Sequence, residues 1–382
     1  METSLTERCA GRLRNEILSG SLNARKGLIT ERALCLKLKV SRVTVRRCLA
    51  RLQSENLLRS IPYKGYVLGP AAHAGRDANE SDKPKRDLLL FVQSPDSRPL
   101  LSTVHERYIW EGLVEEAARF GLKAQPCRMP LKALLREIKT FAMKNLFGVA
   151  LEWFDREAAE TLLSEGIPAA LVEYVHEGVP LDAISQDDEG GMEQAIARLW
   201  NLGHRRLGLI VWSEQIFQPM RRRAAFAASL LRRGVVEAGR VGLTDRFDNV
   251  GGREAVAKLF DRDDPPTALI LCHPEHTAGV FDELDHRGLK VGRDVSLIAW
   301  GTPETQAAWL EHTRWAHEKL DLITWSRREM GQLVVRVLQA RSLDPLLPPM
   351  RVHVPTTVTL HGSSGELKEL KGLGASVVRH SD

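Results

Sequence analysis

Short apolar runs that alternate with amphipathic stretches of helical length are the feature that most restricts the fold of this chain. Each run has the length of a buried strand, and most are separated by enough residues for a helix. The runs are LLLFVQ (88–93), FGVALEW (147–153), AALVEY (169–174), LGLIVW (207–212), TALILC (267–272) and VSLIAW (295–300). This alternation predicts parallel sheets that are covered by helices on both faces.

The region with this alternation is about 275 residues long, which is more than one sheet of this type needs. We therefore expect an α/β body of two lobes over residues 88–364. In open α/β sheets, ligands bind beyond the carboxyl ends of the strands. A ligand of this body is accordingly expected in a cleft between the lobes.

The chain before the body differs from it in composition. Residues 71–87 (AAHAGRDANESDKPKRD) contain no large apolar side chain, which predicts a linker. Residues 1–70 carry 14 Lys and Arg against 5 Asp and Glu, whereas the rest of the chain carries 40 against 44. This asymmetry indicates a small nucleic-acid-binding head, with chance clustering of surface charge as the alternative. Residues 365–382 are polar and contain glycine, so we expect a flexible tail.

The head has the pattern of three helices and a hairpin. Apolar residues recur at helical spacing at Leu5, Cys9, Leu13 and Ile17. Thr30 and Ser41 stand where N-caps would begin two further helices. After the third helix, LLRSIPYKGYVLG has two short apolar runs around a turn, which suggests a small hairpin. This order of elements predicts an N-terminal winged helix-turn-helix of the α+β class.

The expected third helix, within SRVTVRRCLARLQSENLL (41–58), has two unlike faces. Its inward stripe consists of Val45, Cys48, Leu49 and Leu52. The opposite arc carries Arg42, Val43, Arg46, Arg47 and Arg51. An exposed Val43 is out of place on a solvated face, but it can contact a thymine methyl while arginines bind base edges and phosphates.

The head resembles the GntR-type winged-helix domain over nearly all of residues 5–68. The segments that carry the resemblance are LRNEILSGSL, ITERALCLKLKVSRVTVRRCLARLQSENLLRS and KGYV. It implies DNA contacts by Arg32, by Arg42, Thr44 and Arg46, and by Gly65 in the wing. With their neighbours, the candidate DNA-binding residues are Arg32, Arg42, Val43, Thr44, Arg46, Arg47, Lys64 and Gly65. Lys39 replaces the usual glycine of the turn, and we expect it to be left-handed at some cost.

The body resembles the LacI/GalR-type regulators. The matching segments are ISQDDEGGMEQAIARLWNLGHRRLGLIV (184–211), PTALILCHPEHTAGVFDELDHRGLKVGRDVSLIAWG (266–301) and VPTTVTLHGSS (354–364). The resemblance implies a periplasmic-binding-protein-like body whose lobes close on a small molecule, with three chain crossings between them. It also implies that Arg222 contacts the ligand and that Phe247 stacks on it. His273 and Glu275 stand where the family commonly has an Asn-Asp pair.

Residues at strand ends supply further candidates for the effector site. Ser94 and Asp96 follow the first strand, and Glu152, Glu173 and Trp300 end later ones. Carboxylates, an arginine and aromatic rings suit a polyhydroxylated ligand, because its hydroxyls need hydrogen-bond partners and its ring faces can stack. The alternative for each residue is a surface or supporting role. The candidate effector-binding residues are Ser94, Asp96, Glu152, Glu173, Arg222, Phe247, His273, Glu275 and Trp300.

Several other functions find little support in the sequence. No GxSxG, Walker A, HExxH or GxGxxG motif is present, so neither an enzyme nor a cofactor is expected. HPEH (273–276) has no further Cys or His at a recognisable spacing, and no metal site is expected. Five scattered cysteines without a CxxC pair, and apolar runs too short to cross a bilayer, predict reduced thiols in a cytoplasmic protein without membrane contact.

These patterns together predict a DNA-binding transcriptional regulator. We expect a repressor that binds a palindromic operator as a homodimer and responds to a small, sugar-like effector. One alternative is a DNA-binding protein whose body only dimerises and has lost sensing. The other is an α/β enzyme with a DNA-targeting head.

Overall fold

The computed structural model describes most of the chain and divides it into two compact units. The described residues are 5–18, 29–61, 65–69, 71–74, 86–94, 104–137, 145–152, 154–214, 217–235 and 240–367. Residues 1–85 form the first unit, the head, and residues 86–382 form the second, the body.

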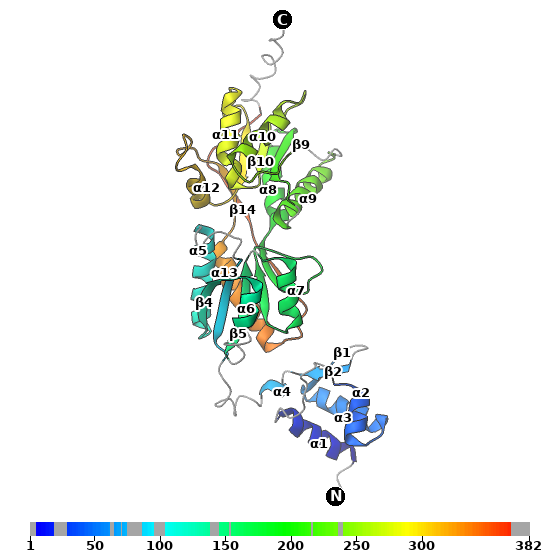
Figure 1. Cartoon of the computed structure of the whole chain (residues 1–382). Helices are drawn as coiled ribbons and strands as arrows, with labels where there is room; N and C mark the ends of the chain where they lie inside the picture. The colour runs from blue at the N-terminus through cyan, green and yellow to red at the C-terminus, as the bar shows by residue number, and fades with distance from the viewer. Residues whose placement is uncertain are drawn as a thin grey trace. The chain divides into compact units, whose positions relative to one another are not determined.

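The head is the winged helix that the sequence predicts (Figure 1). Its elements are α1 (Leu5–Leu18), α2 (Glu31–Leu38), α3 (Arg42–Ser54), β1 (Leu58–Ile61), β2 (Gly65–Leu68) and α4 (Ala71–Ala74). Strands β1 and β2 pair antiparallel. The expected inward stripe of α3 is buried, with Val45, Cys48, Leu49 and Leu52 fully inaccessible. The helix predicted from Leu5 onward is confirmed, and Leu5 itself, at the first position of α1, is 51% exposed.

Caps and one strained residue define the turns of the head. The hydroxyls of Thr30 and Ser41 accept hydrogen bonds from Ala33 N and Thr44 N, so both predicted N-caps are confirmed. Lys39 ends α2 in the left-handed conformation (φ 52°, ψ 43°), as its place at a usual glycine position predicts. This turn brings the start of α3 beside the start of α2.

Contacts at the edges of the expected linker and tail differ from the sequence interpretation. Ala72, in the first turn of the expected linker, is fully buried in the head, and Ala71 N donates to Asn56 O at 3.0 Å. Residues 75–85 lie outside the described residues. At the other end, Gly365 N donates to Ser296 Oγ at 3.0 Å and Leu367 N donates to Leu202 O at 2.9 Å. The expected tail is therefore anchored to the body as far as Leu367, and residues 368–382 lie outside the described part.

The body has two lobes, each built on a six-stranded sheet. Lobe 1 has strand order β13-β7-β6-β5-β3-β4, and all its pairs are parallel. It contains β3 (Leu88–Gln93), α5 (Val104–Arg119), β4 (Lys123–Arg128), α6 (Leu131–Glu137), β5 (Leu146–Glu152), α7 (Arg156–Ser164), β6 (Ala169–Val172), β7 (Asp182–Gln186), α13 (Arg327–Leu343) and β13 (Arg351–Val354).

Lobe 2 has strand order β14-β12-β11-β10-β8-β9, in which only β14 runs antiparallel. It contains α8 (Asp188–Asn201), β8 (Leu207–Trp212), α9 (Phe217–Arg232), β9 (Arg240–Thr244), α10 (Asn249–Phe260), β10 (Ala268–Leu271), the 3-10 turn η3 (Pro274–His276), α11 (Thr277–His286), β11 (Ser296–Trp300), α12 (Pro303–Leu310), β12 (Asp321–Thr324) and β14 (Thr357–Thr359). The fold class predicted from the sequence is confirmed, and the antiparallel β14 is an addition to it.

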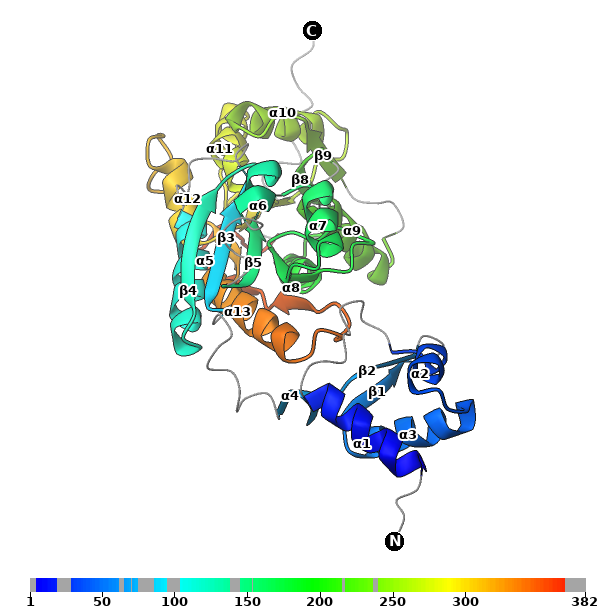
Figure 2. The ribbon, with the colours of Figure 1, turned by 60° about the horizontal axis from the view of Figure 1, so that its bottom comes forward.

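Both faces of each sheet are buried under helices (Figure 2). In lobe 1, Leu89 and Phe91 of β3 pack with α5 and α13, whereas Leu90 and Val92 pack with α6 and α7. In lobe 2, α8 and α9 cover one face, and α10, α11 and α12 cover the other. This explains why the strands read as continuous apolar runs rather than as alternating ones.

The chain crosses between the lobes three times, as predicted. It passes from β7 to α8 at Asp187, from β12 to α13 at 325–326, and from β13 to β14 at 355–356. The third crossing separates two short strands, β13 in lobe 1 and β14 in lobe 2. All three crossings leave the carboxyl ends of lobe strands, so those ends lie next to the junction between the lobes.

Candidate functional site

The outward face of α3 is the first candidate site. Arg42 and Arg46 extend from it with side chains 68% and 65% exposed, and Val43 between them is 61% exposed. The hydroxyls of Ser41 and Thr44 lie 2.9 Å apart at the start of the helix. An apolar side chain this exposed, framed by arginines and hydroxyls, suits contact with base edges better than contact with water alone.

A carboxylate on the neighbouring helix holds two of these arginines. Glu31, at the start of α2, accepts hydrogen bonds from Arg46 Nε at 2.9 and 3.1 Å and lies 3.4 Å from Arg42 Nε. The hydrogen bond that Arg46 donates to the Glu31 carboxylate raises the pKa of Arg46. Sequence reasoning missed Glu31, because the contact depends on the tight turn at Lys39 that sets α2 beside α3.

The other head candidates have varied surroundings. Arg32 and Arg47 are exposed, Gly65 begins β2, and Lys64 lies outside the described residues. Gly65 has φ 130°, and an added Cβ would lie 2.7 Å from the Ile29 carbonyl oxygen, so this position requires glycine. The requirement is structural in the first place, because Ile29 and Tyr66 form a backbone bridge there.

Carboxylates end two strands of lobe 1 at the junction. Glu152 ends β5, is fully buried, and accepts a hydrogen bond from Gln93 at the end of β3. Burial, followed by the nearby Glu173, raises the pKa of Glu152 well above 4.5. Glu173 follows β6 in a left-handed conformation (φ 62°) and lies 3.2 Å from Arg327 Nε. Strain of this kind in a buried non-glycine residue is concentrated at functional sites.

Arg222 is the centre of a buried polar cluster in lobe 2. Its Nε donates to Asp188 Oδ1 at 2.9 Å, and its Nη1 donates to the Cys272 carbonyl at 2.5 Å. The guanidinium lies 4.2 Å from the centroid of the Trp300 ring. Burial raises the pKa of Asp188, with Arg222 opposing the shift. Arg221 instead bonds Glu189 nearer the surface, so Arg222 is the buried member of the run 221–223.

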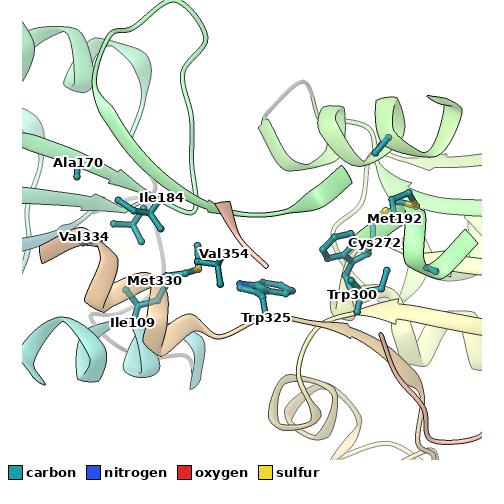
Figure 3. Close-up of a cluster of buried hydrophobic side chains, with 14 of the residues drawn as sticks. Ile109, Ala170, Ile184, Met192, Cys272, Trp300, Trp325, Met330, Val334 and Val354 are labelled. Carbon is teal, nitrogen blue, oxygen red and sulfur yellow. The ribbon is translucent and has the colours of Figure 1, made fainter. Parts of the chain in front are cut away.

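Two tryptophans, Trp300 and Trp325, contact each other at the junction of the lobes (Figure 3). Their ring centroids are 5.9 Å apart, and the guanidinium of Arg327 lies 4.2 Å from the Trp325 ring. We call the following series of contacting residues the interlobe stack. It consists of Asp188, Arg222, Trp300, Trp325, Arg327 and Glu173. Gln218 of lobe 2 adds a second connection by donating to the Glu173 carbonyl at 2.8 Å.

An aromatic cluster adjoins the stack in lobe 2. Phe247 packs against Trp212 at 4.6 Å and against His273 at 5.2 Å between ring centroids, and His276 lies 5.8 Å from Phe247. Burial lowers the pKa of His273 well below 6.5, and it also lowers the pKa of His276. Both rings are therefore neutral at neutral pH.

Several buried polar atoms around the junction make no hydrogen bond within the described part of the chain. They are Glu152 Oε1, Gln186 Oε1, Asp188 Oδ2, His273 Nε2, Trp300 Nε1, Trp325 Nε1 and Arg327 Nη1. Leaving one such group unsatisfied costs about 1–3 kcal/mol. Because they come from both lobes and include donors and acceptors, a polar molecule at the junction would supply the missing partners.

The structure brings most of the sequence candidates for the effector site together. Glu173, Arg222 and Trp300 belong to the stack, Glu152 neighbours Glu173, and His273 and Phe247 adjoin Trp212. Ser94 directly follows β3 with its N–H 3.4 Å from the Glu152 carbonyl, Glu275 is buried in η3, and Asp96 lies outside the described residues. Sequence reasoning missed Gln93, Asp188, Gln218, Trp325 and Arg327.

Two absences apply to the described part of the chain. No group of three or more His, Cys, Asp or Glu in it has an arrangement that could hold a metal ion. None of its helices combines the length and the apolar character needed to cross a membrane.

The buried histidines predict a loss of stability at acid pH. Because their pKa is lowered in the folded body, the unfolded chain binds protons first as the pH falls through 6.5. We expect the free energy of unfolding to fall by about 1 kcal/mol per pH unit and histidine below pH 6.5. Thermal unfolding between pH 7 and 5 would measure this. His273→Asn should reduce the slope, whereas the same change at the exposed His317 should not; equal slopes in all three proteins would contradict the expectation.

Each of the two units matches the model of a known family. Residues 5–68 match the model of the gntR family of bacterial regulatory proteins. Residues 196–364 match the model of the periplasmic binding protein-like domain. The chain therefore joins a gntR-family winged helix to a periplasmic-binding-protein-like body, and to this extent the resemblance found in the sequence is confirmed.

Curated proteins that match this chain have low sequence identity to it. The ribose operon repressor of Haemophilus influenzae is 22% identical over 215 residues, covering 56% of this chain and 63% of that protein. The transcriptional regulator DegA of Bacillus subtilis is 28% identical over 224 residues, covering 56% of this chain and 65% of that protein. The chain thus spans slightly less than two thirds of the length of either relative.

Solved structures share the fold. A LacI transcriptional regulator from a Rhodococcus species aligns with a TM-score of 0.59 at 21% identity, over 73% of this chain and 98% of that chain. A lac repressor dimer bound to operator and the anti-inducer ONPF aligns with a TM-score of 0.59 at 16% identity, over 80% of this chain and 100% of that chain. At these identities the likeness establishes the fold alone.

Proposed function

We propose that this protein is a DNA-binding transcriptional regulator, a repressor that acts as a homodimer and whose operator affinity is controlled by a small, sugar-like effector. The observation that carries the proposal is the outward face of α3. There Val43 is exposed between Arg42 and Arg46 on a winged helix. The relatives support it, because those described above include a repressor and a transcriptional regulator.

The head contributes two kinds of DNA contact in this proposal. Val43, Thr44 and the Arg42–Arg46 pair enter the major groove, where arginine binds guanine and an apolar side chain contacts the thymine methyl. Arg32, Arg47, Lys64 and Gly65 approach phosphates and the flanking groove. Glu31 restrains the arginines before DNA arrives and keeps their guanidinium groups side by side. A two-fold dimer would present two such helices to a palindromic operator in the cytoplasm.

The body contributes the sensor. Carboxylate, amide and guanidinium groups from both lobes converge on the interlobe stack. Several buried polar atoms there make no hydrogen bond within the described part of the chain. A sugar-like molecule offers hydroxyls to these atoms and ring faces to the aromatic cluster of Trp212 and Phe247. An effector that binds one arrangement of the two lobes more tightly would shift the protein toward that arrangement, with the three crossings acting as hinges. The resulting change in operator affinity is limited by the difference in effector affinity between the two arrangements.

Arg46→Ala tests the DNA-binding part. The DNA probe is a double-stranded sequence that the full-length protein selects from a random pool. We expect the substitution to weaken binding to this DNA by roughly 5- to 150-fold at fixed salt, which is the effect of losing one bidentate base contact. Fluorescence anisotropy would measure the affinity. Arg12→Ala removes an exposed charge from α1 and serves as the matched control, with a small effect expected. Wild-type affinity in the Arg46 variant, or failure to select any sequence, would overturn the assignment.

A further inference from the structure

Among the described residues, the lobe-1 side of the junction buries three carboxylates near one arginine. Glu152, Glu173 and Glu106 are all buried there, at 0%, 5% and 5% exposure. The charged groups that act most strongly on Glu152 are Glu173, Glu106 and a single cation, Arg327. Arg327 is already engaged, because its Nε lies 3.2 Å from Glu173. Burying the like charges of Glu152 and Glu173 beside a single arginine is costly, so this pair calls for a further positive charge.

The lobe-2 side does not supply that charge. Arg222 is bound to Asp188 and to the Cys272 carbonyl, so its charge is balanced within lobe 2. His273, which is buried beside Arg222, is neutral because its pKa lies well below 6.5. Among the described residues at the junction, the two guanidinium groups of the stack are thus each paired with another carboxylate, and neither forms an ion pair with Glu152.

Glu152 also has an acceptor atom available for a ligand. Its Oε2 accepts from Gln93, but its Oε1 is fully buried and makes no hydrogen bond within the described part of the chain. Glu173 beside it is held at φ 62°, which costs free energy that the fold must offset elsewhere. An orphaned carboxylate oxygen next to a strained carboxylate is the pattern of a binding site rather than of a stabilising contact.

We propose that the effector carries a positively charged amino group, as an amino sugar does, and that Glu152 binds this group with support from Glu173 and Glu106. The inference rests on the proposed function and names the ligand class for the same junction. Hydroxyls of the ligand would bind the other unsatisfied atoms, among them Arg327 Nη1 and Trp325 Nε1. An ammonium group donates three hydrogen bonds and matches an acceptor-rich pocket, whereas a neutral hydroxyl does not compensate the charge.

Binding of such a ligand is linked to a proton. The raised pKa of Glu152 means that this carboxyl holds a proton in the free protein until the pH is well above 4.5. When the ammonium group binds, the ionised form of Glu152 is favoured, and the proton leaves to solvent while the ligand keeps its own. Cationic ligands should therefore release up to one proton per site, whereas neutral sugars should release none.

Matched sugars test the ligand class directly. We would measure calorimetric binding of glucose, galactose and mannose and of their 2-amino-2-deoxy counterparts to the full-length protein, in two buffers of different ionisation enthalpy. We expect at least one amino member to bind roughly 30-fold or more tightly than its neutral partner, with proton release. Glu152→Gln should abolish this preference. Glu116→Gln, which removes a buried carboxylate of α5 paired with Arg336 instead, should leave it unchanged.

A second measurement needs no ligand. Because folding raises the pKa of Glu152, the unfolded chain loses its proton first, and the folded body is penalised increasingly as the pH rises above 4.5. Glu152→Gln should therefore raise the Tm of the free protein at pH 7.5 by about 2 °C or more, and by less at pH 4.5. A lower Tm at both pH values would mean that Glu152 is a structural residue and would overturn the proposal.

The outcomes separate this inference from the proposed function. The cationic ligand class would be overturned by any of three results. These are tighter binding of a neutral sugar than of its amino counterpart, an unchanged preference for the amino sugar in the Glu152 variant, and no binding by any amino sugar. Calcium or magnesium at 1 mM, roughly the physiological order, would serve as a further probe. Binding of either ion that releases a proton and is lost in Glu152→Gln would assign the positive charge to a metal ion instead of an amine. Selection of DNA by the head is independent of all these results, so the regulator assignment would stand or fall with the Arg46 experiment.

Discussion

Asp188→Asn should destabilise the body by about 3–5 kcal/mol, because it leaves the buried charge of Arg222 without its carboxylate. The side chains of Asp188 and Arg222 are 0% and 6% exposed, so water cannot replace the lost partner. Asparagine keeps the size of the side chain, and no cavity contributes to the loss. Urea unfolding of the wild type and the variant would measure the change.

The reverse substitution should cost less, and this asymmetry is the sharper test. In Arg222→Met, the remaining Asp188 can take up a proton, because burial already raises its pKa. Arg222 has no such escape, since a guanidinium does not lose its proton in proteins. We expect the double variant Asp188→Asn/Arg222→Met to recover much of the loss. If the two single variants were equally stable at pH 7, the ion pair would not control this part of the fold.

Much of the body was predictable because its signals are local. Strand-sized apolar runs such as 207–212 and 295–300 report burial on both faces of a sheet, and the chain needs a helix between parallel strands. The predicted site residues at strand ends, such as Glu152, follow from the same regularity. Strands that contain polar residues escaped detection: β4 reads KAQPCR, and β12 begins with Asp321.

The partners within the site were not predictable, because they meet only in the folded body. Trp325 and Arg327 follow β12, the strand that the apolar pattern did not reveal, so neither was recognised. Asp188 lies in the acidic turn that the resemblance included, but its role depends on the phase of α9, which turns Arg222 rather than Arg221 toward it. Glu31 likewise meets Arg46 through a turn rather than through sequence spacing.

The same distinction explains why the interlobe stack matters beyond packing. A core residue needs only an apolar side chain of suitable size, and many sequences satisfy that need. The stack instead alternates charged and aromatic groups across two lobes, with Arg222 and Arg327 each lying over a tryptophan ring. Such an arrangement is sensitive to small displacements of one lobe against the other, because cation–π contacts and ion pairs weaken with distance. A ligand that inserts polar groups there has a direct means of altering the lobe arrangement.

Gly331→Ala should destabilise the body by about 3 kcal/mol or more, through backbone overlap rather than loss of a contact. Helices α5 and α13 approach so closely at this point that an added Cβ would lie 2.0 Å from the Ile109 carbonyl oxygen and 2.7 Å from Leu113 N. Backbone atoms cannot rotate away as a side chain can, so the helices must separate. Separation would also disturb Arg327, at the start of α13, and with it the link to Glu173.

Gly11→Ala is the matched control, because it makes the same change in a helix where the added Cβ meets nothing within 4 Å. There the intrinsic preference of alanine for helix should stabilise the head by about 0.5–1 kcal/mol. Opposite signs from one substitution, measured in the unfolding of the unit that contains each site, would isolate steric overlap from helix propensity. Stabilisation by Gly331→Ala would mean that α5 and α13 do not pack at this distance. It would also contradict the position of Arg327 at the start of α13, on which its ion pair with Glu173 depends.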